Sequence, residues 1–187
     1  MIDARVVLRE SAPDDADAIA RLHWLGWEQT YRGALPDALL DGTTLDMRRT
    51  QWAAWLPDKQ AGLTLAEIAG EAVGFVCAIR ARDIVAHGAA SEIQLLYVLR
   101  QAQGAGVGAA LLRAGAGRAN ALWPGPMGLW VVTGNMRARR FYERMGGRAG
   151  PERREVLRGA AIDEVAYLWD DAATLAAWAR PETEQPG

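Results

Sequence analysis

Hydrophobic and polar residues recur along this chain with two periods, and the changes of period predict where its elements begin and end. Patterns with apolar residues at every second position predict strands at 5–10, 63–69, 71–80, 92–99 and 127–133, and a last hairpin around 156 and 162–168. Patterns with apolar residues every three to four positions predict helices over 11–31, 46–56, 107–120, 136–145 and 171–179. The polar segment 83–91 is predicted to be a loop.

Local signals predict how several of these helices begin and end. Ser11, followed by Pro13 and two acidic residues, is typical of a helix start with a serine cap. Pro57 is expected to stop the helix over 46–56, because proline has no backbone N–H and clashes with the preceding turn. Gly146 and Gly147 are expected to close the helix over 136–145.

The order of the elements predicts the fold class. Strand 92–99, helix 107–120 and strand 127–133 form a β-α-β unit, in which the two strands are parallel and the crossover is right-handed. The remaining strands follow one another as hairpins, so the sequence predicts an α/β fold with a mixed central sheet and flanking helices. A length of 187 residues and the lack of a linker predict one domain over 1–180, with 181–187 a frayed tail.

A glycine-rich turn separates the strand over 92–99 from the next helix. Glycines 104, 106 and 108 allow a tight bend and let the backbone come close to a ligand. The free amides at the helix start favour an anion, so this turn predicts a phosphate or pyrophosphate site. Two other phosphate-binding motifs do not fit. The dinucleotide fingerprint has a different glycine spacing and an acidic residue at the end of the next strand, which this sequence lacks. The nucleotide-triphosphate loop ends in a lysine followed by serine or threonine, and neither follows Gly108.

Three segments resemble signatures of the GNAT-type N-acetyltransferases. QGAGVG at 103–108 resembles the R/Q-x-x-G-x-G/A loop that holds the pyrophosphate of coenzyme A in that family. NMRARRFYERMGG at 135–147 resembles its N-x-x-A-x-x-F-Y-x-x-x-G-F segment, and HWLGWEQTYRG at 23–33 resembles a W-x-x-x-Y-x-G-x-(L/I)-P segment. The resemblance implies the GNAT fold, in which two parallel strands, here 92–99 and 127–133, splay apart and acyl-CoA lies in the gap.

The resemblance also implies a set of cofactor-binding residues and two catalytic ones. The cofactor set comprises the main chain of two strand residues, the loop, a helix-capping asparagine and a tyrosine: Val98, Leu99, Gln103, Gly104, Ala105, Gly106, Val107, Gly108, Asn135 and Tyr142. Glu92 matches the glutamate that serves some members as general base, which the reaction needs because an alkyl ammonium has a pKa of about 10.4. Tyr142 matches the tyrosine that protonates the departing thiolate of coenzyme A.

Each of these residues has an alternative explanation in the sequence. Glu92 also fits a solvated acid at a strand end, with a chain of water molecules as the base. Asn135 could cap its helix only, and Tyr142 could be a core aromatic. The chain departs from the family pattern at Arg100, where proline is common, and at Gln103, where arginine is more frequent. Other arginines could restore the lost positive charge near the phosphates: Arg100, Arg137, Arg139 and Arg140.

The acceptor side of the site is less well marked. Trp27 and Tyr31 are four residues apart, so they share one helix face and are expected to shape the acceptor pocket, although core packing explains them equally well. Glu28 is a candidate partner for a cationic amine or an exposed helix acid. His23 and His87 lie far apart with no ligand spacing around them, so no metal site is expected.

Composition narrows the functional classes. A net charge of −2 argues against a nucleic-acid partner, and no apolar run reaches the ~18 residues of a membrane span. The single cysteine, Cys77, cannot form an internal disulfide and has the alternation of a core strand residue. The N-terminus lacks the apolar core of a signal peptide, so the sequence predicts a cytoplasmic protein.

These observations lead to one main hypothesis and two alternatives. The main one is an N-acetyltransferase that moves an acetyl group from acetyl-CoA, without a metal, to a primary amine by direct attack in a ternary complex. The alternatives are a non-catalytic acyl-CoA sensor and an acetylating toxin that acts on aminoacyl-tRNA, which the net charge disfavours. The sequence does not distinguish small-molecule from peptide acceptors, acyl-chain lengths, or a monomer from a homodimer.

Overall fold

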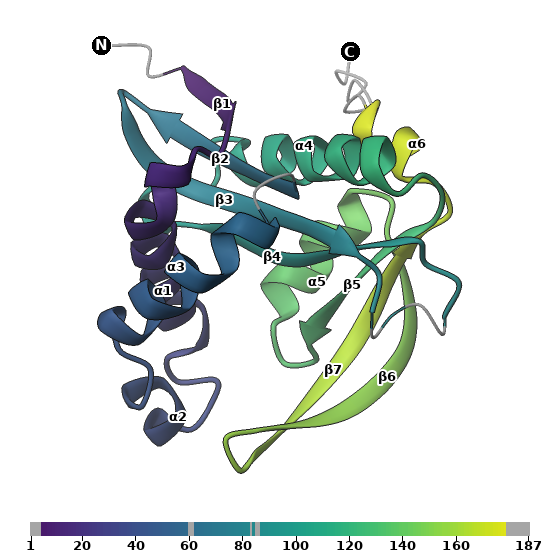
Figure 1. Ribbon diagram of the computed structural model, residues 1–187. Helices are drawn as coiled ribbons and strands as arrows, with labels where there is room; N and C mark the ends of the chain where they lie inside the picture. Colours follow the sequence, from purple (N-terminus) through teal and green to yellow (C-terminus); the bar gives the residue numbers. More distant parts are fainter. Residues whose placement is uncertain (1–4, 60–61, 83, 85–86, 179–187) are drawn as a thin grey trace, which may run out of the picture.

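A computed structural model of the chain describes residues 5–59, 62–82, 84 and 87–178. One seven-stranded sheet runs through it in the order β1-β2-β3-β4-β5-β7-β6 (Figure 1). The strands are β1 (Val6–Glu10), β2 (Leu63–Ile68), β3 (Glu71–Arg80), β4 (Ser91–Val98), β5 (Met127–Val132), β6 (Arg148–Leu157) and β7 (Ala160–Trp169). The α-helices are α1 (Ala16–Tyr31), α2 (Asp37–Asp41), α3 (Leu45–Lys59), α4 (Val107–Leu122), α5 (Met136–Arg144) and α6 (Ala172–Ala176). The tail predicted over 181–187 lies outside the described residues.

Helices cover both faces of the sheet and divide the core into two main clusters. On one face α4 and α5 pack against the sheet, and α6 lies beside the end of α4 (Figure 1). On the other face α1 and α3 enclose a cluster that includes Trp52, Phe75 and Cys77. β3 is buried over most of its length because both layers cover it, which explains its nearly continuous apolar sequence.

The sheet changes character between β4 and β5. β1 to β4 pair antiparallel, as do β5, β7 and β6, and β4–β5 is the parallel pair. That pair joins only Ser91 with Met127 and Glu92 with Gly128, whereas β3 pairs with β4 along the whole strand. β4 and β5 therefore separate after Glu92. The mixed α/β sheet with a splayed parallel pair that the sequence predicts is confirmed.

The structure corrects two predicted helix ends. The first helical turn is a 3₁₀ turn, Pro13–Asp15, and its cap position is Ala12, so a serine cap at Ser11 is wrong. The carboxylate of Asp15 accepts a hydrogen bond from the N–H of Ala12 at 2.6 Å and two more from Arg9, which stabilises this turn. Pro57 does not stop its helix, because α3 continues to Lys59. A proline in the last turn removes only one hydrogen bond of the helix, and the buried Leu56 anchors that turn in the core.

Two elements were not recognised in the sequence at their full extent. The five-residue α2 has too few residues to show a helical period, and buried Leu39 and Leu40 hold it in place. β6 is longer than the segment around Val156 that the pattern marks, because it is an edge strand with mostly exposed side chains. Cross-strand ion pairs of Arg153 with Glu164 and of Arg154 with Asp163 accompany its antiparallel pairing with β7.

Two glycines of α4 provide a matched test of the packing between this helix and the sheet. A methyl group at Gly115 would meet Val76 at 2.7 Å and Ile93 at 3.0 Å, whereas one at Gly117 would have its nearest neighbour, Ala176, at 3.8 Å. We expect Gly115→Ala to lower the free energy of unfolding by about 1–3 kcal/mol through overpacking. Gly117→Ala should raise it by about 0.5–1 kcal/mol, because alanine favours the helix. Urea denaturation measures both; equal effects would contradict the close packing at Gly115.

Candidate active site

A cleft of about 1140 Å³ occupies the region where β4 and β5 separate. Its walls come from the end of α1, from both splayed strands, from the glycine-rich turn and the start of α4, and from α5. Residues Ile93 to Val98 line it from β4, and Leu129 to Val131 line it from β5. The cleft is therefore open along the length over which the two strands are apart.

The glycine-rich turn forms one end of this cleft. Gly104 and Gly106 have φ angles of +87° and +81°, which L side chains rarely adopt, and Gly106 is the N-terminal cap of α4. A Cβ at either glycine would meet no protein atom within 4 Å, so the backbone here faces open space. The turn lines the cleft except at Val107, whose side chain is buried in the core. This geometry is that of an anion site at a helix N-terminus.

The positive charge of the cleft comes from arginines, and only some of them were identified in the sequence. Arg100 and Arg137 line the cleft as expected, whereas Arg139 and Arg140 do not line it. Arg139 instead donates to the carbonyl oxygen of Thr133 at 3.2 Å. Two arginines that the sequence analysis missed, Arg113 of α4 and Arg144 of α5, line the cleft as well. Arg113 lies seven residues after Gly106, about two helical turns further along the same face of α4, and this spacing is the signal that could have found it.

Gln103 carries no charge toward the cleft, and its side chain is hydrogen-bonded to the end of β4. Its side-chain amide donates to the carbonyl oxygen of Val98 at 2.7 Å. Its Oε1 is buried and has no hydrogen-bond partner in the described part of the chain. The side chain thus links the glycine-rich turn to the end of β4, and it leaves one acceptor available at the cleft wall.

Val98 and Leu99, at the end of β4, differ in the direction of their backbone N–H groups. The N–H of Leu99 donates to the carbonyl oxygen of Val73 at 2.8 Å, and its side chain is buried in the cluster under α1 and α3, away from the cleft. Hydrogen-bonding directions alternate along an antiparallel strand, so the N–H of Val98 points to the opposite edge, toward β5. The β4–β5 pairing ends at Glu92, so this N–H faces the cleft.

Glu92 is the residue next to the first cleft-lining residue of β4, Ile93. It belongs to the last residue pair before β4 and β5 separate, and it is only 5% exposed. Its carboxylate accepts a hydrogen bond from the N–H of Arg82 at 3.4 Å. The cleft-lining residues of β4 begin at Ile93, so Glu92 itself does not line the cleft. A proton could pass between an amine in the cleft and this carboxylate only through an intervening group such as water.

Three tyrosines converge on the cleft from three different elements. Tyr31 ends α1, Tyr97 lies on β4 and Tyr142 lies on α5, and all three line the cleft. Burial raises the pKa of each, to about 12 for Tyr31, and the charges of the neighbouring tyrosines add to the effect on Tyr97 and Tyr142. All three phenols are therefore protonated at neutral pH, and the side chains of Tyr97 and Tyr31 are hydrogen-bonded to each other.

Tyr97 was missed in the sequence because it reads as one more apolar strand residue. Its ring packs where α1 has a glycine: a Cβ at Gly26 would meet the ring at 2.6 Å. The signal that could have identified Tyr97 as a cleft residue is its position in the strand that leads directly into the glycine-rich turn. Tyr142 is 8% exposed and its ring contacts those of Phe141, Tyr167 and Trp169, so it has both a core ring and a cleft position.

Asn135 has two contacts that place it between the helix and the cleft. Its Oδ1 accepts a hydrogen bond from the N–H of Ala138 at 3.1 Å, which confirms the predicted cap of α5. The residue also lines the cleft, and a hydrogen bond with the Tyr31 side chain lowers the raised pKa of that tyrosine. Capping and ligand contact are therefore compatible at this position.

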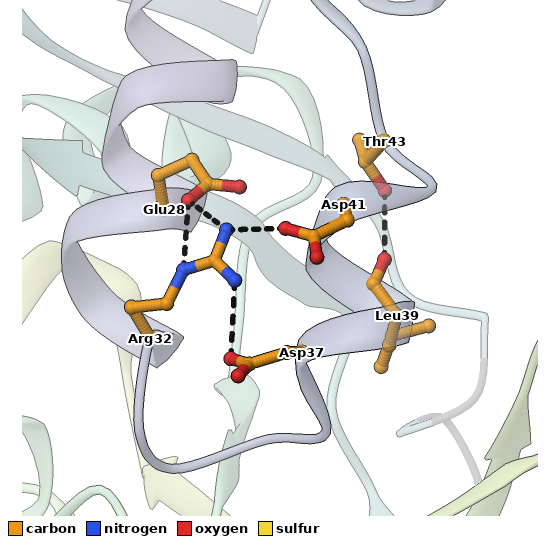
Figure 2. Close-up of polar contacts among 6 residues, drawn as sticks. All are labelled: Glu28, Arg32, Asp37, Leu39, Asp41 and Thr43. Atoms are coloured by element: carbon orange, nitrogen blue, oxygen red, sulfur yellow. Dashed lines mark hydrogen bonds and ion pairs between the residues drawn. The ribbon is translucent and has the colours of Figure 1, made fainter.

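The predicted acceptor pair is brought together, but only one of its members reaches the cleft. The rings of Trp27 and Tyr31 lie 4.7 Å apart, and Tyr31 lines the cleft whereas Trp27 lies behind it. Glu28 is engaged by Arg32, which contacts it at 2.6 Å and also reaches Asp37 and Asp41 of α2 (Figure 2). Arg32 thus ties the end of α1 to α2, and Glu28 has a partner within the protein.

The histidine and the cysteine considered in the sequence, His23 and Cys77, are both buried in the core. His23 accepts a hydrogen bond from the indole N–H of Trp52 at its Nδ1, and burial lowers its pKa to about 3. Burial raises the pKa of the Cys77 thiol to about 11, which disfavours a nucleophilic thiolate. Among the described residues, no three His, Cys, Asp or Glu side chains are grouped as metal ligands would be. None of the described helices has the length and apolar character that crossing a membrane requires.

The fold and the site define an α/β protein with a glycine-rich turn at one end of a cleft in a splayed sheet, and comparison with known proteins assigns the family. The model of the acetyltransferase (GNAT) family matches residues 18–147. An uncharacterized N-acetyltransferase of Archaeoglobus fulgidus is 33% identical over 139 residues, which are 72% of this chain and 88% of that relative. The chain belongs to the acetyltransferase (GNAT) family.

Solved structures agree with this fold. A GCN5-related N-acetyltransferase from Rhodopseudomonas palustris matches with a TM-score of 0.71 at 20% identity, over 91% of this chain and 98% of that chain. A Salmonella typhimurium protein, solved with its cofactor acetyl-CoA, matches with a TM-score of 0.65 at 17% identity, over 96% of this chain and 99% of that chain. At these identities the structures support the shared fold.

Proposed function

We propose that this protein transfers an acetyl group from acetyl-CoA to a primary amine of a small molecule or a peptide. The observation that carries the proposal is the Gly104–Gly106 turn, whose backbone opens onto the cleft at the N-terminus of α4. Pyrophosphate on these amides, with Arg113 and Arg144 nearby, would direct the pantetheine arm between β4 and β5. The Salmonella typhimurium protein of the same fold, solved with its cofactor acetyl-CoA, supports this ligand.

The cleft offers a group for each step of a direct transfer. The amine attacks the thioester carbonyl, and the N–H of Val98 stabilises the negative charge that develops on the acyl oxygen. The carbon–sulfur bond then breaks, and the phenol of Tyr142 donates to the departing sulfur. Before the attack, Glu92 takes one proton of the ammonium through water, which leaves the neutral amine; the second proton, which the nitrogen loses as the amide forms, passes to the departing sulfur, so coenzyme A leaves as the thiol. Because burial raises the pKa of Tyr142, the phenol acts mainly as a hydrogen-bond donor that stabilises the thiolate.

A direct experiment separates this activity from an acyl-CoA sensor. The protein is mixed with acetyl-CoA and a panel of primary amines, and free thiol is followed. We expect thiol release that depends on the amine and follows saturation in both substrates. Tight binding of acetyl-CoA with no amine-dependent release would favour the sensor.

The hydroxyl of Tyr142 provides the sharpest test of the proposed chemistry. We expect Tyr142→Phe to lower kcat by about 10–10³-fold, toward the lower end because the phenol mainly donates a hydrogen bond, with the KM for acetyl-CoA almost unchanged. Phenylalanine preserves the ring contacts, so thermal stability should change little. The measurement is steady-state kinetics with an amine for which chemistry limits turnover.

Tyr167→Phe is the matched control. Tyr167 packs 5.7 Å from the Tyr142 ring, is fully buried and lies outside the cleft lining, and its hydroxyl donates to Glu143 at 2.7 Å. This change should affect stability and leave kcat near that of the unaltered protein. Equal loss of kcat in both variants, or full turnover in Tyr142→Phe, would contradict the role given to Tyr142.

A further inference from the structure

The cleft continues past the glycine-rich turn to an end that none of the proposed transfer steps uses. Its lining there comes from α4, from the end of α5 and from the residue Trp178 that follows α6: Ala109, Arg113, Arg144, Met145 and Trp178. A rise of about 1.5 Å per residue places Arg113 about 10 Å along the axis of α4 from Gly106. We call this part of the cleft the α6 end.

The indole of Trp178 is held in place at the α6 end. α6 is fixed to the core by the buried side chain of Leu175, and the carboxylate of Asp171 caps it by accepting the N–H of Ala173 at 3.0 Å. The ring of Trp178 packs against the turn after α5, because a Cβ at Gly146 would lie 3.0 Å from it. Trp178 is partly buried and lines the cleft, so it presents an aromatic surface in a fixed position.

The two arginines of the α6 end have donors to spare. Arg113 donates from Nη1 to the carbonyl oxygen of Trp178 at 3.1 Å, and no second side-chain hydrogen bond or ion pair joins it to another described residue. Arg144 is exposed and forms no ion pair with any carboxylate in the described ranges. No Asp or Glu is among the described residues that line the cleft. The charge of the α6 end is therefore positive and suits an anion.

Coenzyme A has a part that a pyrophosphate on the glycine-rich turn would direct to the α6 end. The pantetheine arm and the adenosine leave the pyrophosphate on opposite sides, so an arm between β4 and β5 leaves the adenosine over α4. The adenine is a flat aromatic base, and the ribose carries a 3′-phosphate. Indole rings stack on bases, and guanidinium groups bind phosphate through paired hydrogen bonds. Trp178 and the two arginines match this part of the cofactor in shape and charge.

We propose that Trp178 and Arg113 select the acyl donor: the indole packs against the adenine, and Arg113, with Arg144 beside it, binds the 3′-phosphate. The protein then takes its acetyl group from coenzyme A in preference to a donor that carries phosphopantetheine alone. This inference rests on the proposed acetyl transfer and adds two specificity-determining residues to it. Trp178 lies beyond residues 18–147, the part of the chain that the family model matches.

The first test measures binding of shortened ligands to the unaltered protein. Coenzyme A, 3′-dephospho-coenzyme A and 4′-phosphopantetheine are titrated into the protein by calorimetry. We expect loss of the 3′-phosphate to lower the affinity by about 10-fold, and loss of the adenosine as well to lower it by about 10²-fold or more. Equal affinity for the three ligands would overturn the inference, and this result does not depend on the folding of any variant.

The second test repeats these titrations with variants. Trp178→Ala should weaken binding of coenzyme A and of its dephospho form by about 5–50-fold, with the affinity for 4′-phosphopantetheine unchanged. Trp178→Phe preserves a ring against Gly146 and should show a smaller loss with the same ligand pattern, so it replaces an alanine variant that does not fold. Arg113→Gln should weaken coenzyme A by about 10-fold and leave 3′-dephospho-coenzyme A unchanged. A loss that is equal for all three ligands would contradict the contact assigned to that residue.

Trp123→Ala and Arg118→Gln are the matched controls. Trp123 is a partly exposed tryptophan at the end of α4, and Arg118 lies on the same helix and pairs with Glu10 at 2.7 Å. Both residues lie outside the cleft lining, so both variants should bind all three ligands as the unaltered protein does. A ligand-dependent loss in either control would contradict a selection made at the α6 end.

Thiol release from acetyl-CoA with a panel of amines is measured on the same preparations. The expected pattern of affinities without amine-dependent release would support the adenosine contact and contradict the acetyl transfer. Amine-dependent release together with equal affinity for coenzyme A and 4′-phosphopantetheine would do the reverse.

Discussion

Gly106→Val is expected to weaken acetyl-CoA binding by about 10²-fold or more in a chain that still folds. Gly106 has a φ of +81°, which a β-branched residue rarely adopts, so the substitution distorts the turn that presents its amides. The new side chain would also project into the open space beside the turn, where the pyrophosphate is proposed to bind. Calorimetric titration with acetyl-CoA measures the affinity, and thermal unfolding shows whether the variant is folded.

Gly70→Val is the matched control for backbone strain. Gly70 lies in the turn between β2 and β3, has a φ of +82° and likewise has no protein atom within 4 Å of a built Cβ. Both variants should lose about 1–3 kcal/mol of unfolding free energy, but only Gly106→Val should lose acetyl-CoA affinity. Unchanged affinity in a folded Gly106→Val variant would rule out the turn as the pyrophosphate site.

Glu92→Gln is expected to lower turnover at pH 7 by about 10²–10⁴-fold if Glu92 is the sole base. The loss should shrink as the pH rises, because more of the amine is then already neutral. Glutamine preserves an oxygen that can accept the N–H of Arg82, so the variant should keep its fold. The measurement is kcat/KM for one amine between pH 6.5 and pH 10, with thermal unfolding alongside.

The position of Glu92 behind the cleft wall makes the shape of that pH profile decisive. A loss that stays constant up to pH 10 would show that the carboxylate positions β4 rather than accepts the proton. Full activity at pH 7 would show that water alone carries the proton to solvent, and the base would then have to be sought outside Glu92. A loss at pH 7 that is recovered near pH 10 would support proton transfer through water to Glu92.

Features that depend on neighbours in the chain could be predicted from the sequence. The glycine-rich turn, the asparagine cap of α5 and the β2–β3 hairpin follow from local backbone preferences, and the structure has each of them. The parallel pairing of β4 and β5 also follows, because a helix of this length can connect two strands only by a crossover. The motifs that resemble the family, and most of the proposed cofactor-binding residues, lie in these local segments.

Only the tertiary structure decided what depends on residues far apart in the chain. Arg113 and Trp178 are 65 positions apart and line the same end of the cleft because α6 packs beside α4. β6 could not be recognised fully, since an edge strand with mostly exposed side chains has little apolar period. Tyr97 and Glu92 lie on one strand, yet the end of the β4–β5 pairing places Tyr97 in the cleft and Glu92 behind it. Such positions depend on long-range packing and pairing, which a local hydrophobic period does not record.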